Sequence, residues 1–305
     1  MDKQEIVMNA IGNNGFQSTA TAAGYINPEV WNKQVLAFLE ANLVVTPLGK
    51  EYNDLLGAPG DSLNVTINST PVAAAAVDES ADVSITAYAV TTKQFVPTEY
   101  AFAYQLSDKE ARRAFYDVAM DMAKKIGYAL ALKRDTAAVT LLQSGAGNTV
   151  TANNVVASNI ASSDTIDFDD VVKAATEIRK DKLVPKYLII SAGQLGDLSK
   201  STLFATTLPQ GGDATNVLGG KIGRIYGMDV FWTTQISPTA NRSKAIMLGV
   251  DQFGEAAFGI CKKSLPTIRS EREELGRYTT FVGVEEWDMQ VLRADGICTI
   301  ETYDA

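Results

Sequence analysis

The chain has 305 residues, 46% of them apolar, and its 27 basic and 36 acidic residues give a net charge of −9. It contains no histidine, the commonest general base, and its two cysteines, Cys261 and Cys298, cannot supply a four-ligand zinc site. No cluster of basic residues stands out that could bind along a phosphate backbone, so we expect no tight binding of nucleic acid. No apolar run reaches the ~20 residues that cross a bilayer. We therefore expect a soluble cytosolic protein with no cofactor or metal.

The first predicted elements are an arm and a short helix. Residues 1–26 are polar and aperiodic, which indicates an N-terminal arm without a core of its own. Asn27 and Pro28 then favour a helix start, and the apolar stripe that follows must pack on another surface. We therefore expect an entry helix and its connection over residues 27–59.

Residues 60–94 are predicted to form an extended β arm. Leu63, Val65 and Ile67 alternate with polar residues, and the same period of two returns from Val83 to Ala89. Large apolar side chains are few between these stretches. The arm should therefore bury little surface within its own chain.

A stronger strand and a long helix follow. Alternating Tyr100, Phe102, Tyr104 and Leu106 predict a strand, and the motif Ser107-Asp108-Lys109-Glu110 predicts a capping box at a helix start. Apolar residues at helical spacing extend this helix to Gly145, roughly 36 residues or about 54 Å. A bend is expected at Gly127, because glycine destabilises a helix interior.

The second half predicts a mixed α/β region. Residues 148–163 are polar and indicate a linker, and Asp167 caps the next helix. The further predicted elements are a strand at 187–190, a helix at 194–203, strands at 228–233 and 245–250, and extended chain from residue 256.

The order of these parts resembles the Hong Kong 97 capsid fold of tailed-phage major capsid proteins. Ile26-Asn27-Pro28-Glu29-Val30-Trp31 resembles that family's entry helix, and Asp135 followed by Gly145-Ala146-Gly147-Asn148 resembles the end of its spine helix. The stretches similar to successive axial-domain strands are Tyr187-Leu188-Ile189-Ile190-Ser191, Ile225-Tyr226-Gly227-Met228-Asp229-Val230 and Ile246-Met247-Leu248-Gly249-Val250-Asp251-Gln252.

The resemblance implies an α+β fold with an N-terminal arm, an extended β arm, a long spine helix with a peripheral β-sheet, and a mixed α/β axial domain. The peripheral domain would comprise residues 95–150 and 264–305, and the axial domain residues 151–263. It further implies a shell of pentameric and hexameric capsomers that encloses DNA without reading its sequence. The shell would be assembled in the bacterial cytoplasm and become part of the virion. The implied partners are a separate scaffolding protein, a portal and a possible decoration protein.

Two groups of residues are candidates for contacts between subunits. The first lies on the arm, where some relatives also form a covalent cross-link through a lysine, although most lack that reaction: Val72, Asp78, Glu79, Val83, Ile85 and Lys93. The second is a run of alternating charge, which a solvated strand face would equally explain: Arg269, Glu271, Arg272 and Glu273.

Three motifs that resemble catalytic or ligand sites have simpler explanations. The spacing of a phosphate-binding loop is absent from Gly219-Gly220-Lys221-Ile222-Gly223-Arg224. A helix N-terminus favours acidic residues without any metal, which explains Asp167, Asp169 and Asp170. No histidine is present to activate Ser191 or Ser264 as a nucleophile. We therefore expect a structural protein and not an enzyme. The alternatives are the shell protein of an encapsulin nanocompartment and, more remotely, a hydrolase that uses carboxylates alone.

Overall fold

A computed structural model describes residues 43–68, 76, 90–114, 117–200, 221–251 and 254–304. The predicted N-terminal arm, the entry helix and most of the extended arm lie outside these residues. The chain forms two compact units. Unit 1 includes Ala101–Leu130 and Pro266–Val284, and unit 2 includes Ala41–Tyr100, Ala131–Leu265 and Glu285–Ala305. The predicted domain limits stay a prediction.

Unit 2 contains a mixed six-stranded sheet, whose central strand is the most apolar. Its order is β5 (Asn148–Thr151), β12 (Ile297–Tyr303), β9 (Arg242–Val250), β6 (Val184–Ile190), β8 (Met228–Trp232) and β7 (Lys221–Ile225). Strand β6 pairs antiparallel with β9 and parallel with β8. A strand covered on both faces needs an almost continuous apolar run, which Leu188, Ile189 and Ile190 supply.

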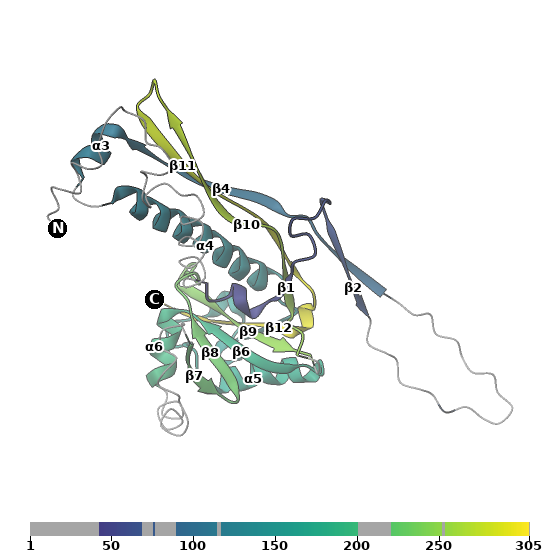
Figure 1. Cartoon of the computed structure of the whole chain (residues 1–305). Helices are drawn as coiled ribbons and strands as arrows, with labels where there is room; N and C mark the ends of the chain where they lie inside the picture. Colours follow the sequence, from purple (N-terminus) through teal and green to yellow (C-terminus); the bar gives the residue numbers. More distant parts are fainter. Residues whose placement is uncertain are drawn as a thin grey trace. The chain divides into compact units, whose positions relative to one another are not determined.

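Helices cover both faces of this sheet because its strands alternate apolar side chains between them. On one face, Leu188, Ile190 and Met247 pack with Val171, Ala174, Ala175 and Ile178, the buried stripe of α5 (Phe168–Lys180) (Figure 1). On the other face, Ile189, Ile246 and Leu248 pack with Ala138, Val139 and Leu142 of α4 (Val118–Ser144). The core of unit 2 therefore has three layers.

One strand of this sheet differs from the sequence prediction. Residues 148–151, predicted to begin a linker, form the edge strand β5, which pairs parallel with β12. The short polar sequence gives little strand signal, because only Val150 is buried while Thr149 hydrogen-bonds its hydroxyl to Thr299 at 3.0 Å. Strand β12, within the predicted extended chain, pairs antiparallel with β9.

A second sheet has four strands, in the order β1 (Lys50–Tyr52), β10 (Phe258–Glu273), β11 (Tyr278–Val291) and β4 (Thr98–Ser107). Strand β4 confirms the predicted aromatic strand, although Phe102 remains exposed. Along β11 every second residue from Phe281 to Met289 is buried. One of these inward positions holds a glutamate, Glu285, instead of an apolar residue.

The predicted long helix is interrupted near its start. Helix α3 (Asp108–Arg113) ends where Ala114 takes an extended conformation, with φ −70° and ψ 141°, and α4 then runs unbroken from Val118 to Ser144. The prediction of one continuous helix with a bend at Gly127 was wrong. Gly127 is a buried residue within α4, and no glycine or proline marks the real break.

The predicted helix end at Gly145 is confirmed, and the glycine motif after it has a packing reason. The amide of Gly147 donates to the carbonyl oxygen of Ala294 at 2.9 Å. A Cβ on Gly147 would lie 2.8 Å from that same oxygen, so a side chain cannot fit there.

The Ser107 half of the predicted capping box is confirmed, because its hydroxyl accepts a hydrogen bond from the amide of Glu110 at 3.2 Å. We expect Ser107→Ala to lower the free energy of unfolding by about 1 kcal/mol, since this amide then loses its protein acceptor. Chemical denaturation followed by circular dichroism measures the change. An unchanged midpoint would mean that the cap does not stabilise the fold.

Within unit 2, one carboxylate fixes the segment before β1. Asp135 of α4 is buried and accepts hydrogen bonds from the amides of Val44 at 3.0 Å, Val45 at 3.3 Å and Thr46 at 3.1 Å. The hydroxyl of Thr46 donates to it as well, at 2.8 Å. Asp135 therefore joins the N-terminal segment to the middle of a helix about 90 residues later.

The residue before it forms a buried ion pair with β11. Arg134 of α4 pairs with Glu285, and both side chains are almost wholly inaccessible to solvent. The indole of Trp287 donates to the other oxygen of Glu285 at 2.7 Å, and burial raises the pKa of Glu285 despite these partners. Neutralisation of either charge would leave the other buried without compensation.

The serine residues of the second region have structural partners. Ser191 directly precedes α6 (Ala192–Lys200). Its hydroxyl accepts a hydrogen bond from the amide of Gln194 at 3.1 Å and donates one to Asp304 at 2.5 Å. Ser264 accepts from the amide of Glu286 at 2.9 Å. Asp167 and Asp170 form a capping box at α5, while Asp169 pairs with Lys173 at 2.8 Å.

Candidate interaction surface

The structure separates the residues predicted to contact other subunits. Val72, Asp78, Glu79, Val83 and Ile85 lie outside the described residues. Lys93 lies on β3 (Val90–Phe95), which pairs antiparallel with β2 (Leu63–Asn68). The predicted strand at 63–67 is thereby confirmed, whereas its described partner is a segment that the sequence did not assign as a strand.

Lys93 is half-buried in this two-stranded ribbon, opposite Val65. At its base the ribbon packs on a small apolar cluster of Leu55, Phe95 and Cys261. The remaining positions of β2 and β3 are mostly threonine, asparagine and glutamine. Lys93 therefore extends from a polar ribbon that is anchored at one end.

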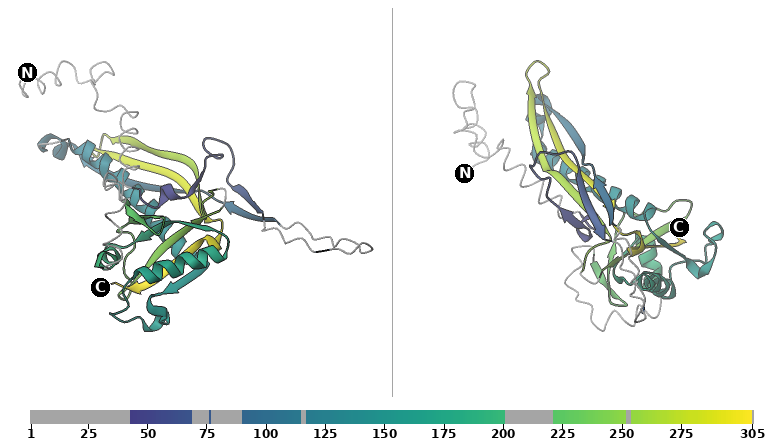
Figure 2. Two further views of the ribbon diagram at one scale, coloured as in Figure 1. Left: turned by 90° about the horizontal axis from the view of Figure 1, so that it is seen from below. Right: turned by 90° about the vertical axis from the view of Figure 1, so that its right-hand side faces the viewer.

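The charged run predicted at 269–273 forms the end of β10 in unit 1. Arg269, Glu271, Arg272 and Glu273 are all exposed, and a turn at residues 274–277 connects β10 to β11. The two strands lie side by side up to this turn in each view (Figure 2). Both faces of the hairpin end are therefore available to solvent.

The hairpin end is fixed to α3 by Arg272. Its guanidinium forms two parallel hydrogen bonds with Asp108, at 3.0 and 2.9 Å, and contacts Glu274 at 3.0 Å. This pairing lowers the pKa of Asp108 and raises that of Arg272. The amide of Asp108 also donates to the carbonyl oxygen of Arg277 at 3.0 Å. Arg272 is thus paired with residues of its own chain, and these hydrogen bonds fix the turn against α3.

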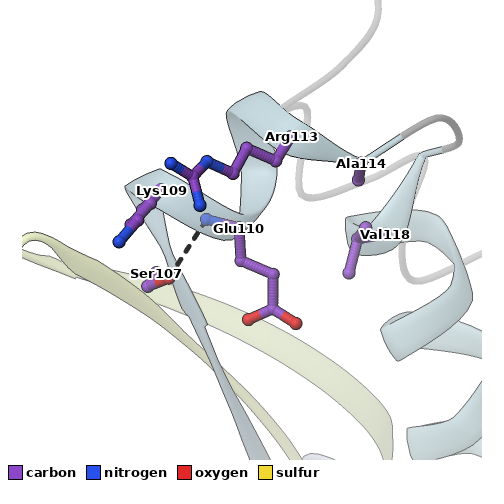
Figure 3. Close-up of a pocket in the computed structure, with 6 residues that line it drawn as sticks. All are labelled: Ser107, Lys109, Glu110, Arg113, Ala114 and Val118. Atoms are coloured by element: carbon purple, nitrogen blue, oxygen red, sulfur yellow. Dashed lines mark hydrogen bonds between the residues drawn. The ribbon is translucent and has the colours of Figure 1, made fainter.

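Two shallow hollows flank α3 in unit 1. One, of about 620 Å³, is lined almost entirely by charged residues of α3 and the hairpin: Asp108, Ala111, Arg112, Arg272, Glu274 and Arg277. The other, of about 410 Å³, also includes the first residue of α4 and is lined by Ser107, Lys109, Glu110, Arg113, Ala114 and Val118 (Figure 3). The second is lined by two apolar residues, Ala114 and Val118, and the first by one, Ala111.

The part of the chain that the structure describes has no group of three or more histidine, cysteine, aspartate or glutamate side chains able to hold a metal ion. Of the helices within that part, none is long and apolar enough to cross a membrane. Burial raises the pKa of the Cys298 thiol to about 12, so it is not a reactive nucleophile.

The sequence did not reveal Arg134, Asp135 and Glu285 as residues that stabilise the fold through buried charge. Asp135 was noted only for its place before a glycine motif, and nothing in the sequence distinguished Glu285 from the acids near it, Glu286 and Asp288. The available signal was the pair Arg134-Asp135 within an apolar helix, since charged residues are rarely buried without partners. Their partners lie about 90 and 151 residues away in the sequence.

Comparison with known families finds one matching model. The model of the phage capsid protein family matches residues 88–304. None of the curated protein sequences compared with the chain matches it.

Solved structures with the same fold include phage capsids and an encapsulin. The cyanophage Pam1 capsid is 12% identical with a TM-score of 0.66, over 96% of this chain and 99% of that one. The capsid of Ralstonia phage GP4 is 12% identical with a TM-score of 0.65, over 85% and 87%. The SrpI encapsulin of Synechococcus elongatus is 10% identical with a TM-score of 0.60, over 95% and 97%.

Proposed function

Because this chain belongs to the phage capsid protein family, we propose that it is the major capsid protein of a tailed phage and self-assembles into a closed icosahedral shell around a double-stranded DNA genome. The observation that carries the proposal is the family match over residues 88–304. The α+β capsid fold predicted from the sequence is confirmed by its likeness to phage capsid structures. The function is structural, and the proposal includes no catalytic step.

Within that function, we assign contacts between copies to the arm and the hairpin end. On the arm they would involve Val72, Asp78, Glu79, Val83, Ile85 and Lys93. A ribbon with few large apolar residues is stabilised mainly by a neighbouring chain, because a two-stranded hairpin is marginal alone. Arg269, Glu271 and Glu273 would add charge pairing at the rim of an interface.

The proposed partners follow from a shell that must be built and filled. Copies form pentameric and hexameric capsomers in the host cytoplasm, with a separate scaffolding protein, a portal and a possible decoration protein. A net charge of −9 suits the wall, because it disfavours tight binding of the enclosed DNA.

A second candidate is the shell of an encapsulin nanocompartment, which the likeness to the SrpI encapsulin favours at the level of fold. The contents of the assembled particles distinguish the two candidate functions. Particles purified from the native source should hold nuclease-protected DNA if the chain is a phage capsid protein, and a protein cargo if it is an encapsulin.

Assembly is the direct test of the proposed function. We expect the purified chain to elute as capsomers or particles many times the 32.7 kDa of one chain, and negative-stain micrographs to contain closed shells. Light scattering from low to high salt measures the mass. A stable monomer under all of these conditions, with and without the genes that flank it co-expressed, would contradict the proposal.

A further inference from the structure

The turn at the hairpin end of unit 1 presents one isolated apolar side chain. Leu275 is 95% exposed, more than any other large apolar residue that the structure describes. The turn holds it in place: Arg272 contacts Glu274, and the carbonyl oxygen of Arg277 accepts from Asp108. Leu275 is therefore a protruding apolar group on a fixed support, exposed to solvent among the described residues.

A shallow hollow with some apolar lining lies beside α3 of the same unit. In the hollow of about 410 Å³, Ala114 and Val118 supply half-exposed apolar surface, while Lys109 and Arg113 carry positive charge and Glu110 negative charge (Figure 3). The larger hollow has five charged residues and only Ala111 as an apolar contact, so it suits a leucine less well.

We propose that Leu275 of one copy inserts into this hollow on a second copy. The proposal rests on the proposed function, since a shell supplies neighbouring copies. Charge is complementary across the contact. The charge of Arg272 is offset by its pairing with Asp108, so residues 273–277 have two acids, Glu273 and Glu274, and one base, Arg277, whereas the hollow has two bases and one acid. Opposite net signs steer the two surfaces together and fix their register.

The two surfaces differ, so the contact is heterologous. Each copy gives a leucine to one neighbour and receives a leucine from another, and such contacts repeat until the rotation closes a ring. Leu275 would supply the apolar centre of this contact, and the charged residues around the hollow would form its polar rim.

The first test changes Leu275 without disturbing the fold. Leu275→Asp should form particles only at a protein concentration about tenfold or more above that of the wild type, which corresponds to about 1.4 kcal/mol, because a charged aspartate cannot replace the apolar side chain in the contact. Its melting temperature should not change, since the side chain is 95% exposed. The matched control is Val156→Asp, at a residue of unit 2 that is 69% exposed, which should assemble as the wild type does.

The second test locates the partner surface. The double variant Leu275→Cys/Ala114→Cys, assembled and then oxidised, should give a ladder of linked chains on a non-reducing gel, whereas Leu275→Cys/Val156→Cys should not. The background is low because the native Cys261 and Cys298 are both buried. Assembly of Leu275→Asp at wild-type concentration, or unlinked chains from assembled double variant, would overturn the inference while the proposed function stands. Failure of the wild type itself to assemble would overturn both.

Discussion

Arg134→Met will lower the free energy of unfolding by about 3–5 kcal/mol at neutral pH, because it leaves the Glu285 carboxylate buried without its cation. Chemical denaturation measures the loss. Lys133→Met is the matched control, since it removes the same charge from the exposed neighbouring position of α4 and should change stability by less than about 1 kcal/mol.

The pH dependence of this variant gives a sharper test. Burial already raises the pKa of Glu285, and Arg134 opposes that rise. A carboxyl group whose pKa is higher in the folded state than in the unfolded state binds a proton more tightly when folded, so stability is lost as pH rises through the folded pKa. Removal of Arg134 raises that pKa further. The variant should therefore recover stability as pH falls from 7 toward the ordinary glutamate pKa of about 4.3.

A double variant tests whether the loss of stability comes from the uncompensated charge of Glu285. Arg134→Met/Glu285→Gln removes both charges and keeps an acceptor for the indole of Trp287. Replacement of a whole buried pair is often neutral, so the double variant should be more stable than Arg134→Met alone. Equal losses in the single and double variants at every pH would contradict a role for the uncompensated charge.

Asp135→Ala should cost about 3 kcal/mol or more, because it leaves three backbone amides and the Thr46 hydroxyl without their acceptor, and unmade hydrogen bonds of buried groups cost about 1–3 kcal/mol each. Asp135→Asn retains one carbonyl oxygen and should lose less. Hydrogen exchange at the amides of residues 44–46 should accelerate in Asp135→Ala more than at β6.

The control for Asp135 is another aspartate of the same helix. Asp121 pairs with Lys125 near the surface at 2.9 Å, so Asp121→Ala should cost at most about 1 kcal/mol. A loss from Asp135→Ala no larger than that from Asp121→Ala would mean that the segment before β1 is held mainly by its apolar contacts.

Local patterns predicted those elements whose signal lies within a few residues. The Ser107 and Asp167 caps, the alternation of β2 and β4, and the apolar run of β6 each involve neighbouring positions, and each is present. Even the half-exposed β4 followed its alternation, because a strand needs only one covered face to show period two.

The errors arise where distant contacts decide the local structure. The break at Ala114 has no glycine or proline. Asp108 at the start of α3 accepts hydrogen bonds from Arg272 and donates its amide to the carbonyl oxygen of Arg277, and both partners lie more than 160 positions away. Strand β5 is four residues long and exists by pairing with β12. Arg134 and Asp135 are adjacent, so on a helix they point about 100° apart and reach two different partners, neither of which their own sequence identifies.

The exposure of Leu275 could not be predicted either. A leucine between Glu274 and Gly276 fits a turn, but only the structure shows that this side chain is 95% exposed. The five arm residues remain predictions, since they lie outside the described residues.

The attachment of residues 44–46 to Asp135 has a mechanical consequence. Four hydrogen bonds converge on one carboxylate, and β1, a few residues later, pairs parallel with β10. A pull on the chain at residue 43 therefore loads these bonds together, so they rupture as a group at a higher force than bonds that open one by one. Tension applied to the N-terminal segment passes directly into helix α4 and does not peel β1 from its sheet.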